Sequence, residues 1–411
     1  MGLIVQKYGG SSVADAGRIR RVARRIADAK DRENQVVAVV SAMGDTTDHL
    51  RDLARQVSSD PDARELDLLL STGETVSVTL VAMALREIGC QAISLTGGQA
   101  GIHTTSAFNR AHILRVDPQR IHRELDSGRI VIVAGFQGIS EDLDVTTLGR
   151  GASDTTAVAL AAALKAVRCE IYTDVEGVYT ADPRIVPEAR KLKDIHYEEM
   201  LELASLGARV MHNRSVELGA VYNIPILVSS SFTHAPGTLI HGDISMDEVR
   251  EIRNKVRGIA HDLDVAKITI TGVPDRPGIA ASIFDPLAEA GISVDTIVQN
   301  ASTTKVADLT FTVSKGDLDK AITLVRPVAA SLGAGECLGD PHLAKVSIVG
   351  AGIQNAPGYA ARMFKTLADA GINIEMITTS EIRITCVVSE DHVIEAVKAL
   401  HRAFELEKAE D

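Results

Sequence analysis

The sequence predicts an α/β protein in two parts: a mainly parallel sheet sandwiched by helices, followed by two smaller βαββαβ units. Three observations lead to this prediction. Short β-branched runs alternate with longer helical patterns up to about residue 240, a polar stretch follows at 241–254, and the remaining chain holds an internal repeat. Alternating strands and helices specify a mainly parallel sheet covered on both faces. The 411 residues exceed the usual size of one domain, so several compact units are expected.

The elements of the first part follow from periodicity. Strands are expected at 3–6, 36–40, 92–95, 130–134, 170–173 and 226–228, and helices at 14–30, 75–88, 155–164 and 197–207. The runs VVAVV and IVIVAGF are apolar almost throughout, as in strands buried on both faces. One basic run, at Arg18, Arg20, Arg21, Arg24 and Arg25, has helical spacing and is interpreted as a solvated helix face rather than a membrane or nucleic-acid patch.

The internal repeat defines the second part. One copy begins at Ala266 and the other at Ala344, and the two align over more than thirty residues. The matching positions are Gly272 with Gly350, Pro277-Gly278 with Pro357-Gly358, and Ala290-Gly291-Ile292 with Ala370-Gly371-Ile372. Each copy reads strand, Gly/Pro loop, helix, turn, strand, and then a further strand, helix and strand, which is the ferredoxin-like plan. We therefore expect domains at 1–242, 263–335 and 343–411, with a linker at 243–262.

Composition excludes several classes of function. The formal charge is −12, from 43 basic and 55 acidic residues, which disfavours a nucleic-acid or anionic-membrane binder. The four cysteines form no CxxC pair, and the twelve histidines are scattered, so we expect reduced thiols and no protein-held metal site. No signal peptide or run of 18 consecutive apolar residues occurs. We expect a soluble, cytoplasmic protein.

A phosphate-binding turn is the first candidate for chemistry. Lys7-Tyr8-Gly9-Gly10-Ser11-Ser12 lies directly after the first strand and before the first helix. Two glycines allow close backbone approach to a phosphate, serines add donors and Lys7 adds a positive charge. A plain strand-to-helix turn capped by Ser is the alternative. The sequence has no P-loop motif, and the dinucleotide-like stretch 349–353 carries Asn355 where the third glycine would stand, so we interpret it as a tight turn.

Three polar clusters follow other predicted strands, at 41–47, 148–156 and 173–184. Open α/β sheets bind ligands at the carboxyl ends of their strands, so these loops are expected along one edge. For any single cluster, helix capping by Ser, Asp or Thr is an equally simple explanation.

At this point a family resemblance becomes specific. The motifs KYGGSS, SAMGDTTD, STGE, GFQG, TTLGRGASDTTA and YTDVEGVYTADPR resemble the motif set of aspartokinases, in order and over essentially the whole chain. The repeat resembles the paired ACT domains that end those enzymes. The resemblance implies the amino-acid kinase fold and transfer of the γ-phosphoryl group of MgATP to the β-carboxylate of L-aspartate. That reaction yields 4-phospho-L-aspartate, the first step toward lysine, threonine and methionine.

The resemblance also implies roles for single residues in catalysis. Lys7 would stabilise the transferring phosphoryl group, and Gly9, Gly10 and Ser11 would supply backbone amides. Asp154 would orient Lys7 or the loop amides, rather than act as a base, because the attacking carboxylate is already ionised at neutral pH.

Substrate and nucleotide residues follow in the same way. Arg150 would clamp the aspartate carboxylate, and Glu74 would face the ammonium or anchor Lys7, with a first-turn helix carboxylate as the alternative for Glu74. The aspartate pocket would be completed by Ser41, Thr47, Gly151 and Ser153. The ATP pocket would be formed by Thr173, Asp174, Tyr179, Arg184, Arg209 and Val210. Two positions depart from the family pattern: Ala152 replaces a usual Gly, and Arg209 replaces a common Lys.

In the repeat, Asp275 would bind the ammonium of an amino-acid effector. The effector carboxylate would bind at the helix start formed by Gly278, Ile279 and Ala280. Further residues match positions that line or transmit from such sites: Gln299, Asn300, Asn373, Ile374, Thr379, Ser380 and Glu381. Inhibition by lysine, threonine or both is expected, with a homo-oligomer of at least two chains formed through the ACT domains. A repeat without any ligand is the alternative.

Two other functions remain open from sequence. One is a kinase of another small carboxylate, carbamate or nucleotide, such as N-acetylglutamate. The other is a catalytically inactive amino-acid sensor. Met246, just before the repeat, stands where some relatives start a separate regulatory subunit.

Overall fold

The structure, a computed structural model, describes residues 2–32, 34–149, 151–207, 210–242, 256–300, 306–351, 353 and 357–408. The chain divides into two compact units. The first comprises Met1–Val178, Lys191–Ala204 and Arg209–Arg250, and the second comprises Tyr179–Arg190, Ser205–Ala208 and Glu251–Asp411. The short segment Tyr179–Arg190 therefore belongs with the C-terminal half of the chain. Arg150, Arg209, Met246 and most of the expected linker lie outside the described residues.

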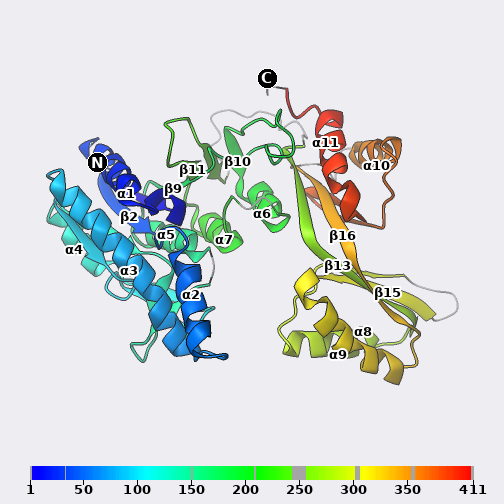
Figure 1. Cartoon of the computed structure of the whole chain (residues 1–411). Coiled ribbons are helices and arrows are strands. Elements are labelled where there is room, and N and C mark those ends of the chain that lie inside the picture. Colours follow the sequence, from blue (N-terminus) through cyan, green and yellow to red (C-terminus); the bar gives the residue numbers. More distant parts are fainter. Residues whose placement is uncertain are drawn as a thin grey trace. The chain divides into compact units, whose positions relative to one another are not determined.

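An eight-stranded sheet forms the centre of the first unit (Figure 1). Its strand order is β10-β12-β11-β9-β1-β2-β6-β3. The strands span Leu3–Tyr8 (β1), Gln35–Val40 (β2), Ala92–Leu95 (β3), Ile130–Ala134 (β6), Arg168–Thr173 (β9), Asp194–His196 (β10), Ile226–Ser230 (β11) and Thr238–His241 (β12). All neighbours pair in parallel except β11 with β12. The predicted mainly parallel α/β fold is confirmed, and all six expected strands are present.

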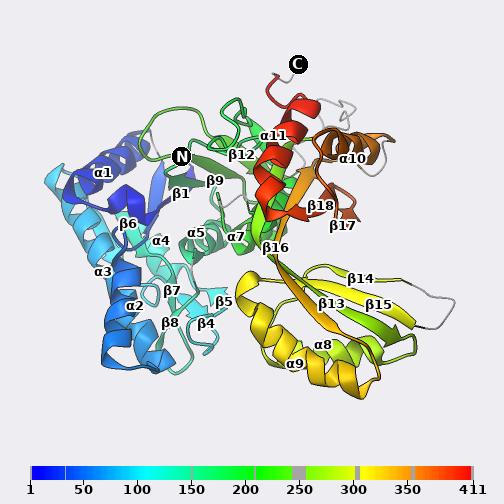
Figure 2. The ribbon, with the colours of Figure 1, turned by 45° about the vertical axis from the view of Figure 1, so that its right-hand side comes forward.

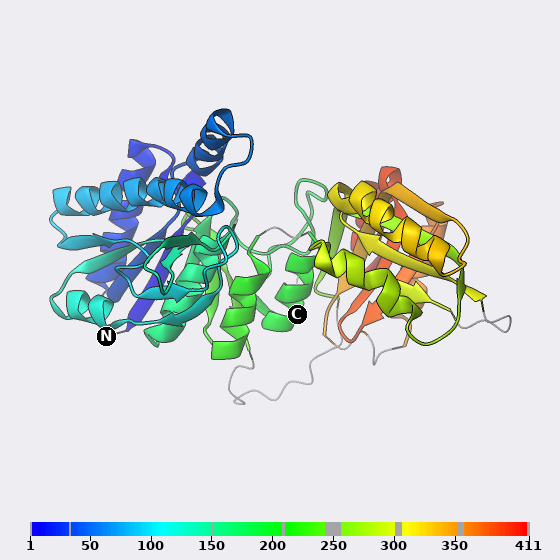
Figure 3. The ribbon, with the colours of Figure 1, turned by 90° about the horizontal axis from the view of Figure 1, so that it is seen from below.

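Helices cover both faces of this sheet. One face packs against α1 (Ala16–Asp31) and α3 (Ala63–Glu87), whose apolar residues share a cluster with β1, β2 and β6. The other face packs against α5 (Ala152–Ala163), which also contacts α7 (Asn213–Tyr222). Figure 3 shows the blue helices on one side of the strands and the green helices on the other. The unit also contains α2 (Thr46–Val57), α4 (Gln119–Asp126) and α6 (Tyr197–Ser205). A parallel sheet buried on both faces accounts for its near-continuous apolar strands.

A small four-stranded sheet was not expected from the sequence. It has the order β5-β4-β7-β8 and consists of Ile102–Thr104 (β4), Ile113–Val116 (β5), Gln137–Ile139 (β7) and Val145–Thr147 (β8). Strands of three or four residues leave no clear periodicity. The helix predicted at 75–88 was also too short, because α3 begins at Ala63. The STGE motif thus lies inside a helix, and the interpretation of Glu74 as a first-turn carboxylate is wrong.

The repeat forms a single six-stranded antiparallel sheet in the second unit (Figure 2). Its order is β14-β15-β13-β16-β18-β17. The strands are Gly258–Pro274 (β13), Ile297–Gln299 (β14), Val306–Val313 (β15), Cys337–Val349 (β16), Met376–Ser380 (β17) and Arg383–Ser389 (β18). The helices α8 (Ile279–Glu289) and α9 (Leu318–Ser331) pack on the core of the first copy, and α10 (Tyr359–Asp369) and α11 (Val393–Ala403) on that of the second.

The two copies are not built alike, which corrects one prediction. The second copy has no strand of its own after α11 among the described residues. The start of β13 supplies the last strand of this βαββαβ unit. There, Gly258–Asp262 pairs with Val349–Lys345 of β16. Two long strands therefore serve both copies, and register shifts between Asp262 and Lys267 mark the passage from one core to the other.

Ion pairs repeat the symmetry of the two copies. Lys267 of the first copy contacts Glu375 of the second at 3.0 Å, and Lys345 of the second contacts Asp295 of the first. These lysines occupy equivalent positions in the aligned repeat, as do the acidic residues. The expected reduced cysteines agree with the structure, in which all four are free.

One helix of the described chain, α3, is long and apolar enough to cross a membrane by length and composition. Its best 18-residue window has a mean hydropathy of 1.6, and half of that window is buried inside the protein. The core helix of a globular domain has the same properties.

Candidate active site

A buried ion pair joins the first strand to the helix that follows the Gly-Arg-Gly segment. Side chains alternate along β1, so Lys7 points to the face opposite Gln6 and Tyr8. Its Nζ lies 2.7 Å from Asp154 Oδ1, and the two side chains are only 12% and 9% exposed. Asp154 sits in the first turn of α5. The structure thus brings together two predicted catalytic residues that are separated by 147 positions in the sequence.

The glycine turn lies against the loop that follows β2. Gly10 accepts a hydrogen bond from the Gly44 amide at 3.1 Å. A Cβ atom on Gly10 would lie 2.8 Å from the Ala42 carbonyl oxygen, closer than such contacts allow. Glycine is therefore required here for the close approach of two backbones. Ser41 continues the same pairing, because its amide donates to the Tyr8 carbonyl at 3.1 Å. Thr47 lies in the first turn of α2, directly after this loop.

Glu74 enters the same region from the middle of α3. It is 2% exposed, and its Oε1 accepts a hydrogen bond from the Ala42 amide at 3.1 Å. Its Oε2 has no hydrogen-bond partner among the described residues. Burial raises the pKa of Glu74 to about 7. Since the ion pair of Lys7 is with Asp154, the carboxylate of Glu74 is left with one oxygen able to accept a hydrogen bond from a ligand.

Two residues of the basic run bind backbone carbonyls, one in the glycine turn and one near the end of β11, which modifies our interpretation of that run. Arg18 donates to the Ser11 carbonyl at 2.6 Å and lies over the Phe232 ring. Arg25 donates to the carbonyl of Ser230, the last residue of β11, and to that of Thr233 in the loop that follows. Arg20, Arg21 and Arg24 are exposed as expected.

The loop before Arg150 is anchored by residues that the sequence did not reveal. The buried Asp67 accepts hydrogen bonds from the Thr147 amide and hydroxyl, both at 2.7 Å, and from the Asn109 amide. Arg214 donates to the Leu148 carbonyl at 2.9 Å. A single acid within the apolar stretch LDLLL was a usable signal for Asp67, whereas Arg214 had none.

The start of α5 completes this side of the region. Gly151 forms its N-cap with a φ of 77°, and Ser153 packs beside Gly135 of the GFQG motif. Ala152 is fully buried in an apolar cluster with Leu70 and Phe136. The methyl group that departs from the family pattern is therefore accommodated in the core.

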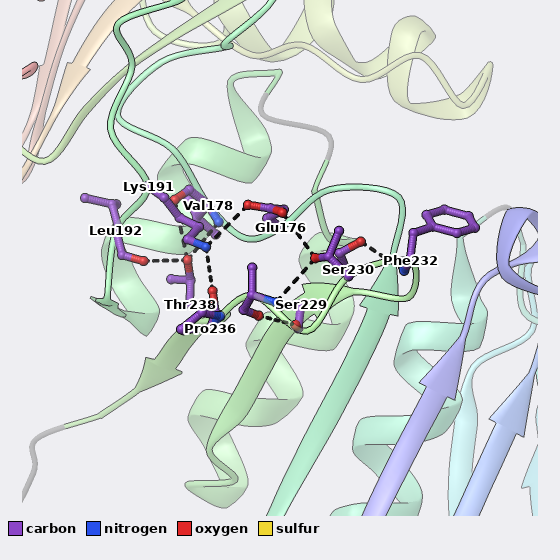
Figure 4. Close-up of polar contacts among 11 residues, drawn as sticks. Glu176, Val178, Lys191, Leu192, Ser229, Ser230, Phe232, Pro236 and Thr238 are labelled. Carbon is purple, nitrogen blue, oxygen red and sulfur yellow. Dashed lines mark hydrogen bonds and ion pairs between the residues drawn. The ribbon is translucent and has the colours of Figure 1, made fainter. Parts of the chain in front are cut away.

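Polar contacts fix the loops that follow β9 and β11 (Figure 4). Lys191 donates to the Pro236 carbonyl at 2.6 Å and lies 3.6 Å from Glu176. Thr238 accepts from the Val178 amide at 2.9 Å and donates to the Leu192 carbonyl at 2.6 Å. Thr173 and Asp174 stand at the end of β9, where the Thr173 hydroxyl donates to the Asp174 carboxylate.

The remaining predicted nucleotide residues are divided between the units. Val210 lies in the turn before α7 in the first unit. Tyr179 and Arg184 belong to the second unit, where the Arg184 guanidinium forms a bidentate pair with Asp182 at 2.7 and 3.0 Å and is 88% exposed.

The predicted effector residues lie mainly on the surface of the second unit. Gly278 forms the N-cap of α8 with a φ of 93°, and Gly358 repeats this conformation with a φ of 108° at the start of α10. Ile279 is buried and Ile374 and Ser380 are half-buried. The others are exposed: Asp275, Gly278, Ala280, Gln299, Asn300, Asn373, Thr379 and Glu381.

Comparison with protein families gives one assignment for each part. The amino acid kinase family matches residues 2–230. Two ACT domain models match residues 267–329 and 346–404.

Full-length relatives agree with these matches. The chain is 52% identical to an aspartokinase of Mycolicibacterium smegmatis over 412 aligned residues, covering 99% of this chain and 97% of that protein. It is 50% identical to an aspartokinase of Pseudomonas aeruginosa over 408 residues, covering 99% and 98%.

Among solved structures, E. coli aspartokinase III in complex with aspartate and ADP has a TM-score of 0.81 and 26% identity, covering 98% of this chain and all of that one. The same enzyme with lysine and aspartate has a TM-score of 0.75 and 27% identity, covering 98% and 99%. An amino acid kinase domain, a tandem ACT repeat and half-identical relatives along the whole chain show that this protein belongs to the aspartokinase family.

Proposed function

We propose that this chain transfers the γ-phosphoryl group of ATP to the β-carboxylate of L-aspartate, giving ADP and 4-phospho-L-aspartate. Mg²⁺ enters with the nucleotide as part of the substrate. The observation that carries the proposal is the buried Lys7–Asp154 pair beside the Gly9-Gly10 turn. Glu74 adds to it, because its Oε1 binds the Ala42 amide and its Oε2 has no hydrogen-bond partner among the described residues. The E. coli aspartokinase III structure with aspartate and ADP supports the choice of substrates.

Phosphoryl transfer requires that charge on the phosphoryl group be neutralised and that the reacting groups be held in position. One oxygen of the aspartate β-carboxylate attacks the γ-phosphorus while the bond to the β-γ bridging oxygen breaks, and ADP leaves with those electrons. The attacking oxygen is already ionised at neutral pH, so the step needs no general base. Lys7 would neutralise charge on the phosphoryl oxygens, and Asp154 would hold the ammonium of Lys7 in place. The amides of Gly10 and Ser11 would bind phosphate oxygens. Gly9 would only permit the close approach of the phosphate, because its own amide donates to the Tyr172 carbonyl at 3.2 Å.

Substrate recognition would use the groups that face this region. The free oxygen of Glu74 is suited to the substrate ammonium, and Arg150 to its carboxylate. Ser41, Thr47, Gly151 and Ser153 would complete the aspartate site. Thr173, Asp174, Tyr179, Arg184, Arg209 and Val210 would hold the nucleotide.

Hydroxylamine trapping tests the proposal. Purified protein with MgATP, aspartate and hydroxylamine should form aspartyl hydroxamate, because hydroxylamine captures the acyl phosphate. ADP release should be supported by aspartate and not by N-acetylglutamate or UMP. Absence of hydroxamate would favour the inactive-sensor alternative, and ADP release with N-acetylglutamate alone would favour another carboxylate kinase.

Regulation forms a second part of the proposal. Lysine, threonine or both would bind the ACT pair and stabilise a less active arrangement. The lysine complex of E. coli aspartokinase III supports this class of effector. Most of the predicted effector residues are exposed on a single chain, which fits a site completed by pairing of ACT domains between at least two chains. The cytoplasmic location, the domain limits and an internal start at Met246 remain proposals from sequence.

A further inference from the structure

The segment that carries Tyr179 and Arg184 is built into the core of the second ACT copy. Ala181 and Val186 are each 4% exposed and belong to the apolar cluster that contains Leu367 of α10 and Leu400 of α11. The Thr180 carbonyl accepts a hydrogen bond from the Ile259 amide of β13 at 2.7 Å. The backbone between the two predicted nucleotide residues is therefore fixed by contacts with the regulatory half of the chain.

A buried polar contact joins this segment to α11. Nε2 of His401 lies 3.0 Å from the Thr180 hydroxyl, and both residues are buried, with exposures of 1% and 0%. The Thr180 oxygen also accepts from the Arg190 amide at 2.9 Å. The Glu407 carboxylate, 3.8 Å from Nδ1, favours a proton on that nitrogen, and Nε2 is then the acceptor of the Thr180 hydroxyl hydrogen. The ring proton of neutral His401 then resides on Nδ1.

The other ring nitrogen faces a cavity. Nδ1 has no hydrogen-bond partner in the described part of the chain, and the Glu407 carboxylate lies 3.8 Å away. The cavity has a volume of about 340 Å³ and is lined by His401, by neighbouring side chains of α11 and its C-terminal extension, and by residues 185–188. Among the described residues, the side-chain hydrogen bond of the imidazole is therefore the one with Thr180.

We infer that His401 is a positioning residue for the nucleotide: its neutral imidazole accepts the Thr180 hydrogen bond and holds the segment 179–190 in the conformation that ATP requires. The inference rests on the proposed function through the nucleotide roles of Tyr179 and Arg184. If the segment loosens, ATP binding must first restore its conformation, and the apparent affinity falls accordingly. The chemical step itself, which depends on Lys7, should change little.

Protonation of His401 offers a specific signature. Burial lowers the pKa of His401, the carboxylates of Glu407 and Glu188 act in the opposite direction, and Arg190 adds to the lowering. Lys398 and Arg402, on the same helix, also line the cavity. A protonated ring cannot accept the Thr180 hydrogen. The contact should therefore be intact at neutral pH and lost as the pH falls below the ordinary histidine value of 6.5.

Substitutions in the full-length protein test the inference. His401→Leu removes the acceptor and should raise the KM for ATP roughly ten-fold, with kcat and the KM for aspartate within about two-fold of wild type. His401→Gln keeps an acceptor at a similar reach and should restore most of the affinity. Thr180→Val, of nearly equal volume, should match His401→Leu, and the double variant should be no worse than either single variant. Lys398→Gln, which lines the same cavity, should have no effect.

Two readouts separate positioning from a merely structural role. The ratio of the KM for ATP of wild type to that of His401→Gln should rise as the pH falls below 6.5. Calorimetric binding of MgADP gives a readout that does not depend on turnover. If wild type binds MgADP and His401→Leu binds it equally well, the inference is overturned; equal losses for ATP and aspartate would overturn it too. If wild type binds no MgADP, the proposed function fails instead.

Discussion

The kinase unit and the ACT unit present their predicted functional residues to water in opposite ways. In the kinase unit, Glu74 and Asp154 are 2% and 7% exposed, and Lys7 is held by an ion pair. In the ACT unit, eight of the eleven predicted effector residues are exposed. Charges that act on a transition state must be held in place before it forms, which requires burial and fixed partners. A regulatory site can instead be completed when a ligand or a second chain covers it.

This contrast predicts that substitutions at the buried residues of the kinase unit change catalysis and stability together, whereas those at the exposed effector positions of the ACT unit change inhibition alone. The following experiments test that division.

Loss of the Lys7 charge should have the largest effect. Lys7→Met keeps the side-chain volume but removes the cation from the phosphoryl oxygens, so kcat should fall by roughly 10²–10³. The hydroxamate assay measures it, with circular dichroism to verify folding and Lys365→Met, an exposed lysine, as the matched control. Retention of more than a tenth of the wild-type kcat would exclude Lys7 from the chemical step.

Glu74→Gln should increase stability at neutral pH while weakening aspartate binding. Because the pKa of Glu74 is raised from 4.5 to about 7, the folded state holds a proton that the unfolded state releases between these values. The free energy of unfolding therefore falls as the pH rises through this range, by about 3 kcal/mol from this residue. Urea unfolding at pH 4.5 and 8 should show this loss in wild type and not in Glu74→Gln. An unchanged pH dependence would contradict the burial of a free carboxylate.

Asp154→Asn should reduce kcat by roughly ten- to a hundred-fold, less than Lys7→Met, because the amide still accepts a hydrogen bond from Lys7 but no longer balances its charge. The shape of the pH–rate profile should stay the same. Loss of a basic limb from the kcat profile would instead assign Asp154 as a general base.

Substitution at the exposed effector positions should have the smallest effect. Gln299→Ala should leave kcat and both KM values unchanged and shift the stability by less than about 0.5 kcal/mol. It should raise the lysine or threonine concentration needed for half-inhibition roughly five-fold. Initial rates across an effector titration provide the measurement, with the exposed Thr323→Ala of α9 as control. A change in basal kcat would break the proposed separation.

The same contrast explains what the sequence could predict. The six predicted strands of the kinase unit carry short β-branched runs, so their positions follow from local patterns, and their mainly parallel pairing follows from their alternation with helices. The Lys7–Asp154 contact was implied by the family resemblance rather than by strand positions, because Lys7 lies within β1 and Asp154 lies in α5, after a strand of the small sheet. The repeat with its two Pro-Gly helix starts was equally visible, since the structure places Gly278 and Gly358 at the same conformation.

Contacts between segments that are distant in the sequence could not be predicted from local patterns. Gly258–Asp262 supplies a strand to the second copy although it precedes the first, and nothing local marks that choice. The buried acceptor Asp67, the clamp Arg214 and the contact from His401 to Thr180 each join segments at least 42 residues apart. Single polar residues of this kind have no periodicity, and their partners become evident only when the chain is folded.

A crystal structure with aspartate and MgADP bound would test the central claim most directly. We expect the terminal phosphate of ADP within hydrogen-bond distance of Lys7 Nζ and of the Gly10 and Ser11 amides. We also expect the aspartate ammonium at Oε2 of Glu74 and the aspartate carboxylate at Arg150. Nucleotide phosphates bound away from Lys7, or aspartate bound away from Glu74 and Arg150, would contradict it.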